Sequence, residues 1–164
     1  MNIKTRLFVL LIIFSFTTQI FSSSQSIKRD LDKNIDSLMQ KVVGWRLNID
    51  EFPELSNREF QTAKKVADHL ESLGLEVKTG VAHTGVVAIL EGGKSGPMVA
   101  LRADMDALPV EEMTGLPFAS KVRDKYNGLD VGVMHACGHD AHVAILMVVA
   151  EFLVSVQDKL RGSI

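Results

Sequence analysis

One short stretch of the chain, residues 132–142, restricts its fold and chemistry more than any other part of the sequence. It holds the only cysteine, Cys137, and three of the five histidines. A thiolate, imidazoles and a carboxylate are the side chains that transition metals accept as ligands. A second apolar run, residues 143–150, follows directly, which predicts a loop that leads into a buried helix. We interpret this stretch as half of a metal site.

The spacing within the stretch limits how these donors can meet. Cys137 and His139 are two residues apart and would not share a helix face, but Gly138 between them allows a turned backbone that brings both to one ion. His139 and His142 have the i, i+3 spacing that a helix start places side by side. Two other interpretations stay open: a buried structural cysteine with solvated histidines, and a Cys137 nucleophile with His135 or His139 as its base. The sequence lacks the flanking residues of known cysteine-hydrolase signatures.

Two aspartates, Asp104 and Asp106, directly follow a predicted buried strand at residues 97–103. Functional groups of open α/β sheets gather outside the carboxyl ends of strands. Residues i and i+2 of an extended chain also point to the same side. One of the two aspartates could therefore bind a metal or accept a hydrogen bond from a metal-bound histidine. The alternative is that both only form the turn before Pro109.

The rest of the chain shows helical and strand patterns in turn. Helices are predicted from apolar spacing at residues 27–47, 60–73 and 143–156. Strands are predicted at residues 75–79, 85–91 and 97–103. The last two strands are continuous apolar runs, which indicates cover on both faces. Ser56 and Glu59 have the spacing of a capping box for the second helix, and residues 111–130 are expected to form a long loop. This order predicts a layered α/β fold.

Composition and the N-terminal segment bear on partners and compartment. The net charge of -2 and the lack of a Lys/Arg cluster argue against a nucleic-acid partner, and a single cysteine excludes an internal disulfide. Lys4 and Arg6 precede an apolar run at residues 7–16, so residues 1–24 are expected to be a signal peptide. The expected protein is secreted or periplasmic, without stable membrane contact after cleavage. The alternative is an uncleaved membrane anchor, although polar residues interrupt the run.

Two motifs together carry a resemblance to a known family: LRADMDALP at residues 101–109 and MHACGHDAH at residues 134–142. They resemble the amidohydrolase branch of the zinc-aminopeptidase-like metallopeptidases. That branch includes hippurate hydrolase, N-acyl-amino-acid amidohydrolases and hydrolases of indole-acetyl-amino-acid conjugates. The similarity runs from about Trp45 to the end and includes an early Pro-Glu-Leu element. Many members have a histidine three residues before its proline, where this chain has Asp50.

The resemblance implies a three-layer α/β/α catalytic domain of zinc-peptidase type. In the family a smaller lid or dimerisation domain is inserted after the first half of that domain. Residues 25–164 would then be the N-terminal portion only, without the lid domain and the C-terminal half. A homodimer is left open for the longer protein.

The resemblance also implies a site and a reaction. Cys137 and His139 map onto metal ligands, and Asp106 maps onto an aspartate that supports catalysis. Asp104 stands where related peptidases have a histidine ligand, and it is not assigned as a ligand. The implied cofactors are two divalent metal ions, manganese or zinc. The implied reaction is hydrolysis of the amide bond of an N-acyl amino acid, or a similar amide conjugate, by metal-activated water.

The same resemblance places the general-base glutamate and two further histidine ligands after Ile164. We therefore expect the chain to be an incomplete fragment of a metal-dependent amidohydrolase, inactive by itself. The competing hypothesis is a non-catalytic metal-binding or interaction module on the same scaffold. A Glu-Glu pair and two histidines in the downstream coding sequence would favour the enzyme, whereas a genuine stop codon would favour the module.

Overall fold

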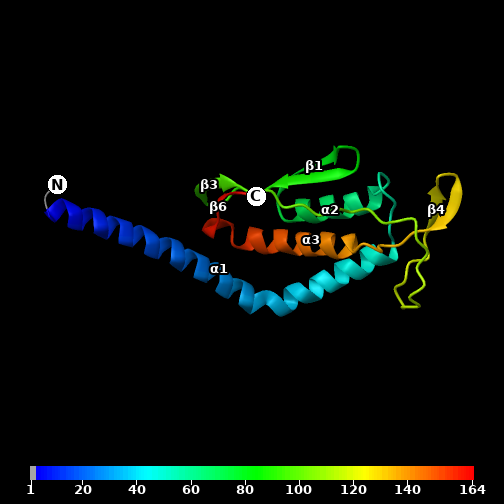
Figure 1. The fold of residues 1–164 in the computed structure, drawn as a ribbon, viewed down its shortest axis with the longest axis horizontal. Coiled ribbons are helices and arrows are strands. Elements are labelled where there is room, and N and C mark those ends of the chain that lie inside the picture. Colours follow the sequence, from blue (N-terminus) through cyan, green and yellow to red (C-terminus); the bar gives the residue numbers. More distant parts are fainter. Residues whose placement is uncertain (1–2) are drawn as a thin grey trace. The chain divides into compact units, whose positions relative to one another are not determined.

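The computed structural model describes the backbone of residues 3–164 and the side chains from Ser24 onward. The chain divides into two compact units, Met1–Asp36 and Ser37–Ile164. In chain order the elements are α1 (Ile3–Glu51), α2 (Phe60–Ser72), β1 (Glu76–Val81), β2 (Gly85–Ile89), β3 (Lys94–Met98), β4 (Arg123–Tyr126), β5 (Leu129–Gly132), α3 (His139–Ser155), a 3-10 helix η1 (Gln157–Lys159) and β6 (Arg161–Ser163) (Figure 1).

The first unit contains the beginning of α1. Its described side chains include Asn34, whose amide donates to the carbonyl of Asp30 at 2.7 Å along the helix. The predicted signal peptide, residues 1–24, lies outside the residues with described side chains except for Ser24. Where side chains are described, none of the helices has both the length and the apolar character needed to span a bilayer.

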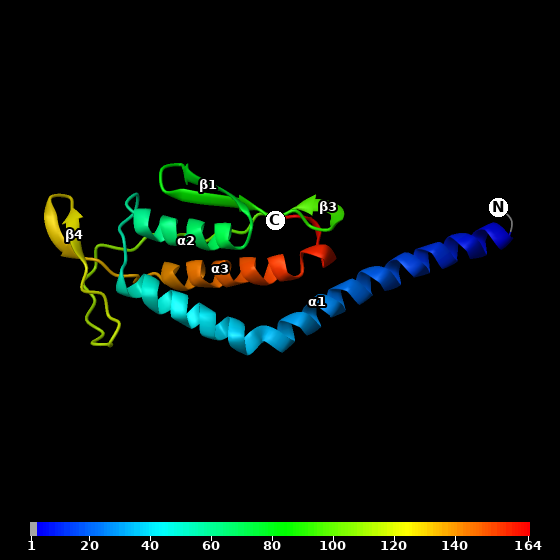
Figure 2. The ribbon, with the colours of Figure 1, turned by 180° about the vertical axis from the view of Figure 1, so that it is seen from behind.

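The second unit is built on helices. Ile49 at the end of α1 packs with Val143 and Met147 of α3 in a buried cluster, and Trp45 and Val66 pack against it. The β1–β2 hairpin, α2 and α3 follow one another as neighbours in both ribbon views (Figures 1 and 2). Because α3 is apolar on almost every side, it needs neighbours all round, and its place between other elements agrees with the predicted central helix.

The β1–β2 hairpin is antiparallel, with Glu76 opposite Ile89. Its turn needs a glycine at Gly85, because a Cβ there would lie 2.4 Å from the carbonyl oxygen of Val81. Val87 and Ile89 are half exposed, at 45% and 50%. The prediction that residues 85–91 are covered on both faces is therefore wrong for this chain. The hairpin packs on α2, and the described residues place no second layer over Val87 and Ile89.

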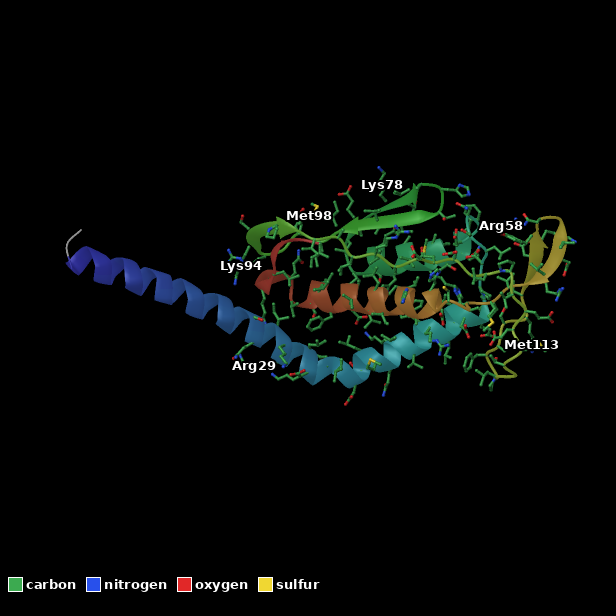
Figure 3. The ribbon with its side chains drawn as sticks, viewed as in Figure 1. Arg29, Arg58, Lys78, Lys94, Met98 and Met113 are labelled. Carbon is green, nitrogen blue, oxygen red and sulfur yellow. The ribbon has the colours of Figure 1, made fainter. Side chains whose placement is uncertain are left out.

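The predicted strand at residues 97–103 is displaced. β3 begins at Lys94, ends at Met98 and pairs in parallel with β6, Lys94 opposite Arg161 and Met98 opposite Ser163. β6 has only three residues, so the chain after Met98 has no long strand to pair with. Met98 is 68% exposed (Figure 3). The apolar residues after Met98 therefore form no strand, because β6, the strand beside β3 in the described part of the chain, is too short to pair with them.

The predicted loop at residues 111–130 is wrong in its second half, where β4 and β5 form a hairpin. Asn127 and Gly128 connect the strands and have positive φ values of 51° and 80°. A two-residue Asn-Gly turn with both φ values positive matches the twist of a hairpin. Arg58 donates to Asp124 of β4 at 2.7 Å and attaches this hairpin to the segment before α2. Met113, in the remaining loop, is 91% exposed (Figure 3).

The predicted capping box at the start of α2 is also wrong. The carboxylate of Glu54 accepts the backbone N–H groups of Gln61 at 3.0 Å and Thr62 at 2.7 Å, and the hydroxyl of Thr62 at 2.9 Å. Glu59 accepts instead the N–H of Asn57 and the hydroxyl of Thr84. The chain folds back between Pro53 and Phe60, which brings an acceptor from further upstream to the helix start.

Candidate metal centre

Asp106 is held in place by its backbone neighbours. Ala107 donates its N–H to the carbonyl of Glu54 at 2.8 Å, and Leu108 exchanges two backbone hydrogen bonds with Met134 at 2.9 and 3.1 Å. Beneath them, Ala107 packs with the buried side chains of Leu55 and Val133. This arrangement joins the two motifs, residues 101–109 and 134–142, although they are far apart in the sequence.

The join brings Asp106 to His139. Nδ1 of His139 lies 3.0 Å from the carboxylate oxygen Oδ1 of Asp106 and 2.9 Å from its carbonyl oxygen. Both partners are acceptors, so Nδ1 carries the proton in a neutral ring and Nε2 keeps its lone pair. A carboxylate that orients a histidine in this way is the usual support of a metal-binding imidazole. Both side chains are partly exposed, His139 at 18% and Asp106 at 26%.

Cys137 lies in the turn that precedes α3. The N–H of Gly138 donates to the carbonyl of His135 at 3.3 Å and closes the turn. Gly138 is the N-cap residue of α3 with a left-handed φ of 88°, as the requirement for a turned backbone between Cys137 and His139 predicts. Cys137 is exposed and is a free thiol. The alternative of a buried structural cysteine is therefore wrong.

Two further predicted residues lie beside this pair. The rings of His139 and His142 have centroids 5.9 Å apart, so the predicted proximity of an i, i+3 pair is confirmed. Asp104 instead accepts two hydrogen bonds from the guanidinium of Arg102, at 2.7 and 3.0 Å. These bonds and the charge of Arg102 lower the pKa of Asp104, with a smaller effect from the two histidines. Asp106, not Asp104, is the aspartate that contacts His139.

Asp140, the carboxylate counted among the donors of the cluster, is not available to a metal. Its side chain is only 2% exposed and accepts a hydrogen bond from Nε of Arg46 at 2.9 Å. The charges of this pair act on the pKa of Asp50. Burial, then the negative charges of Asp140 and Glu112, raise the pKa of Asp50, against a lowering by Arg46. Arg46 and Asp140 thus form an ion pair whose charges also act on Asp50, which spacing along the sequence did not indicate.

His135 is buried, with 6% of its surface exposed. Neither Nδ1 nor Nε2 has a hydrogen-bond partner among the described residues. Burial lowers its pKa, and the smaller influences come from Asp140, His139 and Asp106. The sequence predicted His135 as one histidine of the metal-donor stretch or as a base for Cys137, and the alternative of solvated histidines is wrong for this buried ring.

The residues fit a divalent metal in part. His139 offers a free Nε2 on an oriented ring, and Cys137 offers an exposed thiol in the adjoining turn. A thiolate and an imidazole suit zinc well. However, the described part of the chain contains no group of three or more His, Cys, Asp or Glu side chains placed to hold an ion. The described residues therefore supply two donors and a carboxylate that orients one of them.

A helix-and-strand fold with this pair of motifs defines a metallopeptidase-like domain. Residues 100–164 match the family described as "Peptidase family M20/M25/M40". The predicted resemblance to the amidohydrolase branch of such metallopeptidases is confirmed, because the similar proteins include amidohydrolases and deacetylases. The family match covers residues 100–164, and the similar proteins align with 80% or more of this chain.

Two curated relatives and one solved structure show the extent of the similarity. The chain is 48% identical over 140 residues to "Thermostable carboxypeptidase 1" of Saccharolobus solfataricus, covering 82% of this chain and 34% of that one. It is 43% identical over 131 residues to "N-acetyl-L-cysteine deacetylase" of Bacillus subtilis, covering 80% and 30%. The Bacillus subtilis YXEP protein, described as a dinuclear metal binding peptidase, superposes with a TM-score of 0.68 at 40% identity, covering 78% and 34%.

These matches confirm the predicted α/β class of zinc-peptidase type. The chain spans about a third of the length of the curated relatives it matches.

Proposed function

We propose that the chain is the N-terminal part of a metal-dependent amidohydrolase that cleaves the amide bond of N-acyl amino acids or similar amide conjugates. Cys137 and His139 are its metal ligands, and Asp106 orients His139. The observation that carries the proposal is the contact between His139 Nδ1 and the Asp106 carboxylate, 3.0 Å long, beside an exposed thiol. Neither a solvated surface histidine nor a packed cysteine needs such an arrangement.

The residues of this chain prepare the site in a defined way. The Asp106 carboxylate and carbonyl hold the Nδ1 proton of His139, so Nε2 is presented as a donor without a change of tautomer. Gly138 has a left-handed φ and turns the backbone between Cys137 and His139. The thiol and the ring therefore project from the same short segment. Two divalent ions bound there would supply Lewis acidity and activated water for amide hydrolysis.

The substrate class is inferred from relatives. The deacetylase of Bacillus subtilis is named for the removal of an acetyl group from an amino acid. A second relative, from Geobacillus stearothermophilus, is named "N-acyl-L-amino acid amidohydrolase" and is 39% identical over 137 residues. Both names describe amide bonds between an acyl group and an amino acid, which supports a small-molecule substrate of that kind.

The domain organisation and compartment are part of the same proposal. Residues 1–24 act as a signal peptide, and residues 25–164 form the first part of the catalytic domain. The protein is secreted or periplasmic. The base and the remaining ligands come from polypeptide beyond these residues, as the two-donor set of the described residues would require.

Two measurements test the proposal on this chain. Competition with a chelating dye should show zinc binding that Cys137→Ser and His139→Ala each weaken at least tenfold. An assay of N-acetyl-amino-acid cleavage with added manganese or zinc should show no turnover, because the donor set is incomplete. Zinc binding unchanged in both variants would refute the site. Turnover that Cys137→Ser abolishes would refute the incomplete site.

A further inference from the structure

The buried ring of His135 is the feature of the second unit that the proposed function leaves unexplained. It is 6% exposed, yet both of its nitrogens lack a hydrogen-bond partner among the described residues. Other described histidines are partnered: Nε2 of His69 lies 3.0 Å from the carbonyl of Met147, and Nε2 of His83 lies 3.1 Å from the carbonyl of Asn57. Unpartnered buried polar groups are rare because each one loses its hydration without compensation.

The backbone holds His135 at this position from both sides. Met134, just before it, pairs with Leu108, and the carbonyl of His135 itself accepts the N–H of Gly138. These backbone bonds fix the position of the Cα atom of His135, and its ring is buried there. Two carboxylates act on the pKa of His135 through their charge, and both already have partners. Asp140 accepts from Arg46, and Asp106 contacts His139.

We propose that His135 is a positioning residue of the metal centre, which keeps an unpaired imidazole beneath the Cys137 turn to form a hydrogen bond once the centre is loaded. The inference rests on the proposed function. A neutral imidazole has one donor and one acceptor, so the ring can serve either an acceptor or a donor of the ligand shell. The partner of the ring is a polar group of the metal-loaded centre. In the metal-free chain the ring has no partner, and this lowers the stability of the fold.

This role predicts opposite effects on stability and on metal binding. Replacing an unpartnered buried polar group by an apolar one of similar size removes a desolvation cost and no bond. We expect His135→Leu to raise the melting temperature of the metal-free chain by about 2–4 °C and to weaken zinc binding about tenfold or more. His135→Gln, which keeps a donor and an acceptor, should restore most of the zinc affinity.

His69→Leu is the matched control. His69 is a histidine of the second unit that is partly buried, and unlike His135 it is hydrogen-bonded and packs edge-on against Trp45. Its loss should lower the melting temperature and leave zinc binding unchanged. A purely structural role of His135 would make its leucine variant behave in the same way.

The experiment measures zinc affinity by dye competition and thermal unfolding in chelator for the chain and these variants. A melting temperature of His135→Leu that falls as in His69→Leu would overturn the inference, as would zinc binding that His135→Leu leaves unchanged while Cys137→Ser weakens it. If Cys137→Ser and His139→Ala leave zinc binding unchanged, the proposed metal site fails first, and the inference that depends on it fails with it.

Discussion

Two carboxylates are neighbours of His139: Asp106 contacts its ring, and Asp140 follows it in the sequence. They differ in how far they are buried and in the partner that each one has. Asp106 is 26% exposed and orients the ring of His139 at 3.0 Å. Asp140, the residue after His139, is 2% exposed and accepts a hydrogen bond from Arg46 at 2.9 Å. The chain thus sends adjacent residues of one turn in two directions, His139 toward the site and Asp140 into the interior.

The difference shows how burial decides what a charged contact does. A buried carboxylate that loses its partner leaves an uncompensated charge in the interior, so the Asp140 contact matters chiefly for folding. A partly exposed carboxylate can return to water, so the Asp106 contact adds little stability. What it does provide is a fixed tautomer and ring orientation for His139.

The largest expected effect comes from removing the partner of the buried carboxylate. Arg46→Met should lower the free energy of unfolding by about 3 kcal/mol, the lower end for a broken buried pair, because the guanidinium itself is partly exposed. Urea unfolding measures the change. Arg46→Met combined with Asp140→Asn should recover part of the loss, since the uncompensated charge is gone. A loss no greater than that of Lys64→Met, which breaks the exposed pair with Asp68, would show that Asp140 needs no partner.

Breaking the other contact should affect binding and not folding. Asp106→Ala should weaken zinc binding about 10- to 100-fold, the usual cost of losing a carboxylate behind a histidine ligand. The free energy of unfolding should change by less than about 1 kcal/mol, because water reaches both side chains of this partly exposed pair. Dye competition and urea unfolding give the two numbers. The comparison fails if Asp106→Ala destabilises the fold as strongly as Arg46→Met.

The glycine directly before His139 and Asp140, Gly138, gives the third test. Gly138→Ala should destabilise the chain by about 1–2 kcal/mol, because φ is 88° there and an L-residue is strained at that angle. Apart from its two neighbours along the chain, no heavy atom lies within 4 Å of the added Cβ, so crowding contributes little. Urea unfolding measures the loss, and zinc affinity should fall with it because the turn carries Cys137. Wild-type stability in this variant would mean that the turn tolerates other backbone angles.

The smallest expected effect concerns the second acid near Arg46. Because the pKa of Asp50 is raised by burial and then by Asp140 and Glu112, the folded chain keeps this proton at pH values where the unfolded chain has released it. The associated stability is lost as the pH rises from 3.8, the ordinary value, through the raised pKa. Asp50→Asn should remove this loss and slightly stabilise the chain at neutral pH. Urea midpoints across this range would show it, and identical pH profiles would refute it.

Part of the fold could be predicted because its signals are local. Apolar spacing predicted α2 and α3 as helices, and α3 begins at His139, within a few residues of the expected start. The β4–β5 hairpin was missed although its Asn127-Gly128 turn is a strong short-range signal, because the flanking strands alternate weakly. The cap of α2 could not be read from spacing, since Glu54 reaches the helix only after the chain folds back.

The candidate site also has features that the sequence could predict and features that it could not. The residue types and the turn at Gly138 indicated a thiolate and an imidazole that could meet one ion, and the two motifs together indicated the family. The partner of each carboxylate could not be inferred. Asp106 lies beside His139 because Leu108 pairs with Met134 through the backbone. Asp140 of α3 accepts a hydrogen bond from Arg46 of α1.

Sequence alone therefore determined the candidate donors, Cys137 and His139, and the local geometry that joins them, because both depend on residue type and on backbone preferences over a few positions. Only the tertiary structure decided which aspartate orients the site, which one lies buried with Arg46, and that His135 has no partner. These are properties of burial and of contacts between distant segments, and no local pattern encodes them.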